Sequence, residues 1–131
     1  MKEKDKIYIA GKVSGLTPEQ FHKKFDDCAE WVRNNVNLGE DYDIINPTAL
    51  CEDDWSWLKC MTTCIEQLRK CKFLFLMPDW KDSKGGVCEY FVAVERGIAI
   101  GYLEEDGVDG NGKAKYSINN KSDKKIKCLT K

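Results

Sequence analysis

The sequence predicts a single α/β domain over residues 1–131, in which helices cover both faces of a parallel sheet of four to five strands to make a three-layer sandwich. Strand-like and helix-like segments alternate over about residues 6–102, the order that parallel β-α-β units produce. Two of the strand-like segments, Phe73–Met77 and Ile98–Tyr102, are almost continuously apolar, as expected of strands buried on both faces. Residues 103–131 depart from this pattern and predict an irregular C-terminal tail.

The first unit combines a strand at Lys6–Ala10, rich in β-branched and aromatic residues, with a long helix. Thr17 is suited to cap that helix, Pro18 to occupy its first turn, and Gln20 to complete a capping box. The helix then carries apolar residues at intervals of three and four, which predicts an amphipathic helix that ends near residue 35; these residues are Phe21, Phe25, Cys28 and Val32.

The second unit begins with a strand at Tyr42–Ile45 that stops at Asn46 and Pro47. A loop is expected over residues 48–54, where Asp53 or Asp54 is suited to cap the following helix. The apolar stripe of that helix consists of Leu58, Met61, Ile65 and Leu68.

The third unit contains the strand Phe73–Met77, a loop over residues 78–84 and a helix at about Gly85–Arg96, with Gly97 as its C-terminal cap. In the tail, Asp109–Gly112 has the composition of a hairpin turn. The lysine-rich residues 119–131 are expected to be mobile, although Ile126 and Leu129 are candidates for pairing with a sheet edge.

The composition limits the partners and the compartment. The net charge is −1, so the chain lacks the overall basic field that suits duplex nucleic acid or an anionic membrane. No apolar run approaches the roughly 18–20 residues that span a bilayer, and the charged N-terminus does not resemble a signal peptide. A cytoplasmic location is the expectation.

Cysteine usage supports the same compartment. The seven cysteines are odd in number, and most fall within predicted helices or strands, which indicates reduced, buried thiols. No Cys-x-x-Cys pair occurs and the single histidine, His22, is far from the cysteines in sequence, so no metal site is expected. Cys60 and Cys64 stand one helical turn apart, a spacing that more often reflects packing than redox chemistry.

Unusual residues collect after three of the predicted strands, at Gly11–Gly15, Asn46–Pro47 and Pro78–Gly86. In an open parallel sheet, ligands bind outside the carboxyl ends of the strands. These three loops are therefore expected to meet at one cleft.

Glu89 is the first candidate for chemistry because it interrupts the apolar run Val87–Val94. A buried carboxylate is costly unless it is paired or used. The alternatives are a surface acid or a structural partner of Lys12 or Arg96. Tyr8 could place its hydroxyl in the cleft or pack in the core.

Residues 83–86, Ser-Lys-Gly-Gly, form a possible anion site at a helix N-terminus. The alternative is an ordinary serine cap with glycines for a tight turn. Trp80 could stack on a base or cover the core, and Asp79 and Asp82 could be pocket acids or turn residues. The loop has neither the Walker-A pattern nor the Gly-x-Gly-x-x-Gly pattern, which argues against a triphosphatase or a dinucleotide enzyme.

These motifs, in this order, resemble the nucleoside 2-deoxyribosyltransferase superfamily, and most closely its small, uncharacterised domains from bacteria and phages. The segments that carry the resemblance are Ile7–Gly11, Ile45–Pro47, Trp55, Leu76–Trp80 and Ser83–Glu89. The resemblance covers about residues 6–102 and does not extend to the tail.

The resemblance implies a flavodoxin-like, or Rossmann-like, fold and an enzyme that needs no cofactor and acts on a small nucleoside or nucleotide. Glu89 would be the nucleophile that forms a covalent glycosyl-enzyme, and Tyr8 would orient it. A serine at position 83 is typical of relatives that hold a 5′-phosphate. Relatives complete their sites from a neighbouring subunit, which implies a homo-oligomer. The expected substrate-binding residues are Gly11, Asn46, Asp79, Trp80, Asp82, Ser83, Gly85 and Gly86.

Three positions depart from the superfamily pattern. Cys64 stands where a helper aspartate is common, Lys72 replaces an aspartate at the start of the third strand, and Asp79 replaces a frequent glycine. Two hypotheses therefore remain, an N-glycosidic-bond enzyme (transferase or monophosphate N-glycosidase) and a non-catalytic nucleotide-binding or sensing domain.

Overall fold

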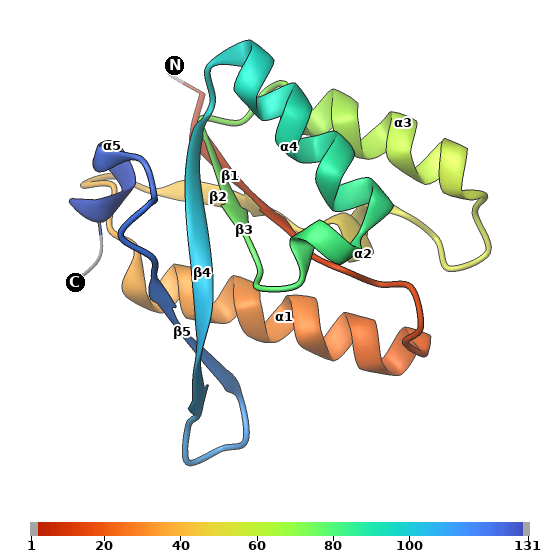
Figure 1. Ribbon diagram of the computed structural model, residues 1–131, viewed down its shortest axis with the longest axis horizontal. Helices are drawn as coiled ribbons and strands as arrows, with labels where there is room; N and C mark the ends of the chain where they lie inside the picture. The colour runs from red at the N-terminus through yellow and green to blue at the C-terminus, as the bar shows by residue number, and fades with distance from the viewer. Residues whose placement is uncertain (1–2, 130–131) are drawn as a thin grey trace.

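A computed structural model describes residues 3–129 as a five-stranded sheet between two layers of helices (Figure 1). The strands are β1 (Asp5–Ala10), β2 (Tyr42–Ile45), β3 (Phe73–Leu76), β4 (Ala99–Val108) and β5 (Ala114–Ile118). The helices are α1 (Pro18–Asn35), α2 (Pro47–Leu50), α3 (Trp57–Leu68), α4 (Lys84–Arg96) and α5 (Lys124–Lys127), with a 3-10 turn, η1, at Trp80–Asp82.

The strand order is β2-β1-β3-β4-β5. The first four strands pair in parallel and β5 is antiparallel to β4. This order is that of flavodoxin-like sheets, whose switch point, the usual ligand position, lies between β1 and β3. The predicted fold class is confirmed.

The two faces of the sheet bury different side chains. Helix α1 packs on one face against Ile7, Ile9 and Phe75, whereas Tyr8, Leu74 and other residues face the layer that contains α3 and α4. Figure 1 shows α1 on one side of the sheet and α3 beside α4 on the other. The alternation along β1 therefore places Tyr8 beneath α3 and α4.

Most local predictions are confirmed. Thr17 and Gln20 form the capping box of α1, and Gly97 ends α4 in the left-handed conformation, with φ of 71°. The cap of α3, however, is Ser56, whose side chain accepts a hydrogen bond from the Lys59 amide, so the assignment to Asp53 or Asp54 was wrong. Asp53 instead contacts His22.

The expected loop after β2 contains helix α2, because Asn46 caps it and Pro47 supplies its first turn.

The tail is more regular than expected. The hairpin is confirmed, with β4 extended to Val108 and paired with β5. Residues 119–129 are not the mobile segment that was predicted. Ile126 on α5 is fully buried in the core beneath β4, and the carbonyl of Leu129 accepts a hydrogen bond from the Asn37 amide. Neither residue pairs with a sheet edge.

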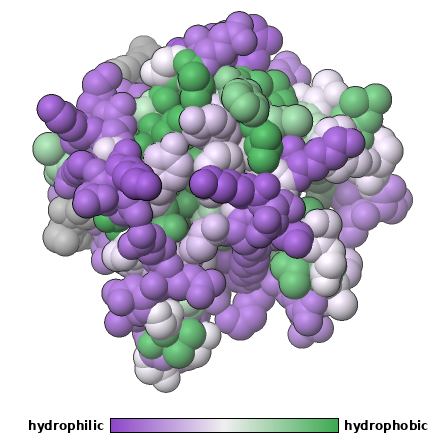
Figure 2. All heavy atoms as spheres, viewed as in Figure 1, coloured by the Kyte–Doolittle hydropathy of each residue, from purple (hydrophilic) through white to green (hydrophobic). Residues whose placement is uncertain are grey.

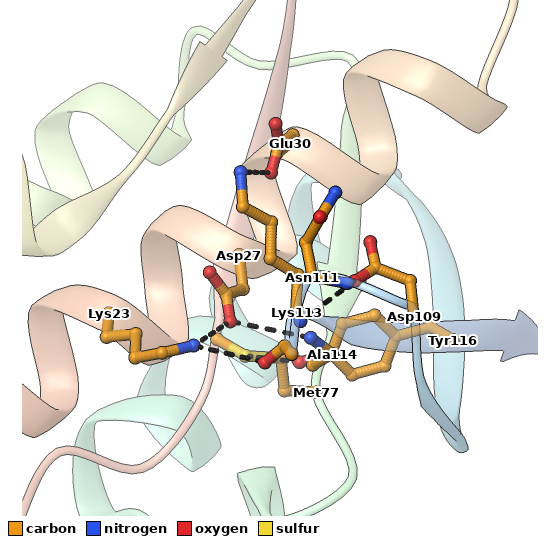
Figure 3. Close-up of polar contacts among 10 residues, drawn as sticks. Lys23, Asp27, Glu30, Met77, Asp109, Asn111, Lys113, Ala114 and Tyr116 are labelled. Carbon is orange, nitrogen blue, oxygen red and sulfur yellow. Dashed lines mark hydrogen bonds and ion pairs between the residues drawn. The ribbon is translucent and has the colours of Figure 1, made fainter.

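Charged side chains fasten the hairpin to α1 (Figure 3). Lys113 pairs with Glu30 at 2.7 Å, and Asp27, held by Lys23, accepts from the amide of Ala114 at 3.4 Å. The predicted polar tail thus becomes part of the fold because its charges complement those of α1.

Replacing Ile126 by valine is expected to lower the free energy of unfolding by about 1 kcal/mol, the usual cost of removing one buried methylene. Chemical denaturation measures this loss. The control is Val108→Ala, since Val108 is 66% exposed, and a surface change of this kind costs less than about 0.5 kcal/mol. Equal effects of the two changes would show that α5 does not belong to the core.

The cysteines differ from the prediction. Cys51 and Cys60 form a disulfide, and Cys88 and Cys128 are exposed free thiols. The expectation of reduced, buried thiols therefore holds for Cys28, Cys64 and Cys71 and is wrong for the other four. The two bonded residues are nine positions apart in sequence, and folding α2 back onto α3 brings them together, which spacing alone did not indicate. Within residues 3–129, no helix is both long and apolar enough to cross a membrane.

Candidate functional site

A buried tyrosine–glutamate pair lies between the sheet and helix α4. Glu89, in the second turn of α4, is 5% exposed, and Tyr8 on β1 is fully buried. The Tyr8 hydroxyl donates a hydrogen bond to Oε2 of Glu89. Glu89 is therefore not a surface acid, and its partner is Tyr8 rather than Lys12 or Arg96.

Burial controls the protonation of this pair. Removal of the carboxyl group from water raises the pKa of Glu89 to about 8, although the hydrogen bond from Tyr8 acts in the opposite direction. Burial, reinforced by the Glu89 charge, also raises the pKa of Tyr8 well above its usual value. Near neutral pH, Glu89 is thus mostly protonated in the free protein.

Cys64 on α3 lies against the pair. Burial raises the pKa of its thiol to about 11, while a hydrogen bond with Tyr8 lowers it. The sulfur atoms of Cys51, Cys60 and Cys64 all lie within 4.8 Å of one another. Cys64, which stands where the resemblance implies an aspartate, is therefore part of a cluster of three sulfur atoms.

Ser83 and the two glycines form the start of α4. Ser83 Oγ accepts a hydrogen bond from the Gly86 amide at 3.0 Å, so the serine cap exists. A side chain at Gly86 would lie 2.9 Å from the carbonyl of Trp80, and one at Gly85 would lie 3.0 Å from the sulfur of Met61. Packing against the backbone thus requires glycine at position 86, whereas a side chain at position 85 would have to displace the flexible Met61 side chain. The amides of Lys84 and Gly85 point out of the first turn without an intrahelical acceptor, as helix geometry requires.

Asp79, in the loop after β3, binds the loop after β1 and helix α1 through its carboxylate. Its two carboxylate oxygens accept from the Lys12 amide, at 3.1 Å, and from the Lys24 side chain. Asp82 is exposed and its amide donates to the Asp79 carbonyl at 3.0 Å. Asp79 is therefore engaged in loop closure, while Asp82 faces solvent.

Gly11 and Asn46 have structural partners. A Cβ at Gly11 would come within 2.6 Å of the Met77 methyl group, so any larger residue at this position would have to displace the buried Met77 side chain. The Asn46 side chain caps α2 through the Thr48 amide and donates to Asp26 at 3.1 Å. Both lie at the carboxyl ends of their strands, as predicted, but these contacts occupy the Asn46 amide group.

Trp80 borders a cavity of about 550 Å³ that lies at the carboxyl end of β3 and beside the middle of β4. Its ring stacks on Tyr90 with centroids 4.8 Å apart and also contacts Tyr102. The wall further includes Lys81, Asn119 and Lys121 but not Glu89. The sequence did not indicate Asn119 and Lys121, because only the docking of the hairpin and α5 brings the tail to this edge. Tyr90 and Tyr102 had a signal in their positions, one beside Glu89 and one at the end of a strand.

One of the comparisons with known proteins bears on the fold. A family model described as "Domain of unknown function (DUF4406)" matches residues 5–102. A solved structure, the 2-desoxiribosyltransferase from Leishmania mexicana, matches with a TM-score of 0.55 at 16% identity, covering 88% of this chain and 79% of that chain. No curated protein matches. At this identity, the structural likeness establishes the deoxyribosyltransferase-like fold and no activity.

Proposed function

Since the chain belongs to the DUF4406 family, whose description names no activity, we propose a function from the site: cleavage of the N-glycosidic bond of 2-deoxynucleosides or their 5′-monophosphates. The single observation that carries this proposal is the buried Glu89 carboxyl group held by the Tyr8 hydroxyl. A glutamate of this kind, on a fold shared with a 2-desoxiribosyltransferase, suits a nucleophile at an anomeric carbon.

In this reaction, an ionised Glu89 oxygen attacks the anomeric carbon of the sugar. The carbon–nitrogen bond breaks, and the base leaves with the bonding electrons and takes up a proton. Water or a second base then attacks the same carbon and displaces the carboxylate, so that two inversions give net retention. Both steps pass through a transition state with positive charge on the sugar, which a buried carboxylate stabilises.

Tyr8 would fix the orientation of the nucleophile. Its hydroxyl holds Oε2 of Glu89, so the second oxygen, Oε1, is the one left to attack. Both Tyr8 and Glu89 are buried, so little water is present to compete for this hydrogen bond. Tyr8 is thus proposed as a positioning residue that limits the nucleophile to one geometry.

Two features support a phosphorylated substrate. Ser83 uses its oxygen as an acceptor for the Gly86 amide, so its hydroxyl proton can donate to a phosphate. The amides of Lys84 and Gly85 lie beside it, at the positive end of the α4 dipole.

Trp80 would lie near the base. Of the two loop acids, Asp82 is the one left for a contact with the leaving base, because both carboxylate oxygens of Asp79 are already engaged.

A second copy of the chain is part of this proposal. Phe91 and Val94, on the outer side of α4, are 63% and 52% exposed, and Figure 2 shows apolar side chains gathered over this helix. A partner that covered them would lie close to the site.

The alternative function is a nucleotide-binding or sensing domain without catalysis. The observation in its favour is that burial raises the Glu89 pKa to about 8, while a thiol, Cys64, occupies the place of the helper acid. A protonated Glu89 cannot attack carbon but can still donate a hydrogen bond to a ligand.

The proposal is tested by incubating the protein with each common deoxynucleoside and its 5′-monophosphate and measuring free base by chromatography. Base release, faster from monophosphates, is the expected result. Saturable binding of nucleotides without release of base would favour the sensing domain, and neither release nor binding would reject both functions.

The rate is expected to rise with pH. Because the nucleophile must be ionised, kcat/KM should increase about tenfold per pH unit below the Glu89 pKa and level off above about pH 8. Initial rates of base release from pH 5 to about 9 measure this profile. A rate that fell over this range would indicate that Glu89 acts in its protonated form.

A further inference from the structure

The sulfur cluster of Cys51, Cys60 and Cys64 joins two helices beside the proposed site. Cys51 directly follows α2, and the other two cysteines lie one turn apart on α3. Cys64 is 2% exposed, and the two remaining residues are half-buried. Of the groups formed by three or more cysteine, histidine and acidic side chains within residues 3–129, only this one is compact enough for a metal ion.

The separations of the sulfur atoms match those of a metal–thiolate site. Cys64 Sγ lies 3.7 Å from Cys51 Sγ and 3.9 Å from Cys60 Sγ. In a tetrahedral site with Zn–S bonds of about 2.3 Å, neighbouring sulfur atoms stand about 3.8 Å apart. Two of the three edges therefore already have the required length.

The third edge is closed by the Cys51–Cys60 disulfide. The Cα atoms of these residues are 5.5 Å apart, so rotation of the two side chains after reduction can separate the sulfur atoms without moving the backbone. A thiol reductant opens the bond in a balanced step: two reductant thiols become a disulfide, and Cys51 and Cys60 each gain a proton.

We propose that the reduced protein binds one Zn²⁺ through the thiolates of Cys51, Cys60 and Cys64, with the disulfide as the oxidised, metal-free form. Binding releases three thiol protons and leaves one coordination position for a ligand from outside the cluster. The ion would link the end of α2 to α3, next to Tyr8. The site does not depend on the proposed glycosidic chemistry.

Cobalt titration of the reduced protein tests the site. The full chain is reduced with a phosphine without oxygen, freed of the reductant and titrated with Co²⁺. The expected result is one Co²⁺ per chain, with strong sulfur-to-cobalt absorption that disappears when Zn²⁺ displaces the cobalt. Cys64→Ser, which leaves the disulfide pair intact, should weaken binding by about 100-fold. Cys51→Ser should have a similar effect.

The matched control is Cys88→Ser, which removes an exposed free thiol from α4 and should leave binding unchanged. Circular dichroism confirms that each variant is folded. The proposal is overturned if the reduced protein shows no sulfur-to-cobalt band, if Cys64→Ser binds as tightly as Cys88→Ser, or if the disulfide resists reduction in the folded protein.

Discussion

Replacing Glu89 by glutamine is expected to lower kcat for base release by about 10⁴-fold or more, as removal of a covalent nucleophile does in other enzymes. The amide fills the same space and can still accept the hydrogen bond from Tyr8, but it cannot attack the anomeric carbon. Initial rates at saturating monophosphate, near pH 8, give the clearest comparison. Nucleotide binding should change little, since the carboxylate acts chiefly on the transition state.

The control is Glu95→Gln on the exposed side of the same helix. It makes the same chemical change to α4 without touching the buried pair, so kcat should stay within a factor of about two, in line with the small effects of surface changes. If Glu89→Gln released base as fast as Glu95→Gln, Glu89 would not be the nucleophile.

Glu89→Gln is also expected to stabilise the folded protein, by an amount that increases as the pH rises. The Glu89 pKa is about 8 in the folded state and near 4.5 in the unfolded chain, as for an exposed glutamate. Between these values, the unfolded state loses its proton while the folded state keeps it, so wild-type stability falls as the pH rises. Glutamine does not titrate and escapes this loss.

Denaturation of both proteins from pH 4 to about 9 should therefore show nearly equal stability at the acidic end. The advantage of glutamine should then grow to a few kcal/mol and become constant above about pH 8. Glu95→Gln serves again as the control and should show no such trend. A constant difference across the range would mean that Glu89 is not held in its neutral form by burial.

The core of the fold could be predicted because its signals are local. The apolar strand predicted at Phe73–Met77, the capping box of Thr17 and the terminal Gly97 each follow from residue types at fixed spacings. Each is found, with the strand one residue shorter, at Phe73–Leu76. The contact between Tyr8 and Glu89 combines two such signals: a strand register that turns Tyr8 toward α4, and an acid on an apolar helix. The resemblance alone suggested that the two side chains meet.

The remaining features depend on contacts between distant segments. Ile126 is one apolar residue among lysines, and its burial depends on packing in the core that also contains Leu103 of β4 and Tyr116 of β5. Asn119 and Lys121 reach the cavity beside Trp80 for the same reason. The cap at Ser56 competed with two adjacent aspartates of similar capping propensity. The Cys51–Cys60 bond depends on α2, a one-turn helix that the sequence reasoning assigned to a loop.

The central claim is that Glu89 becomes covalently bound to the sugar. A deoxynucleoside 5′-monophosphate that carries fluorine at the 2′-carbon and a base that leaves readily should trap the ester. Fluorine withdraws electrons from the positively charged transition states of both steps, while the reactive leaving group keeps the first step faster than the second, so the ester should accumulate. Mass spectrometry of the intact chain and its peptides is expected to find one fluorinated sugar phosphate on the peptide that contains Glu89, and none in Glu89→Gln. Release of base without any adduct, or an adduct on another residue, would contradict the account.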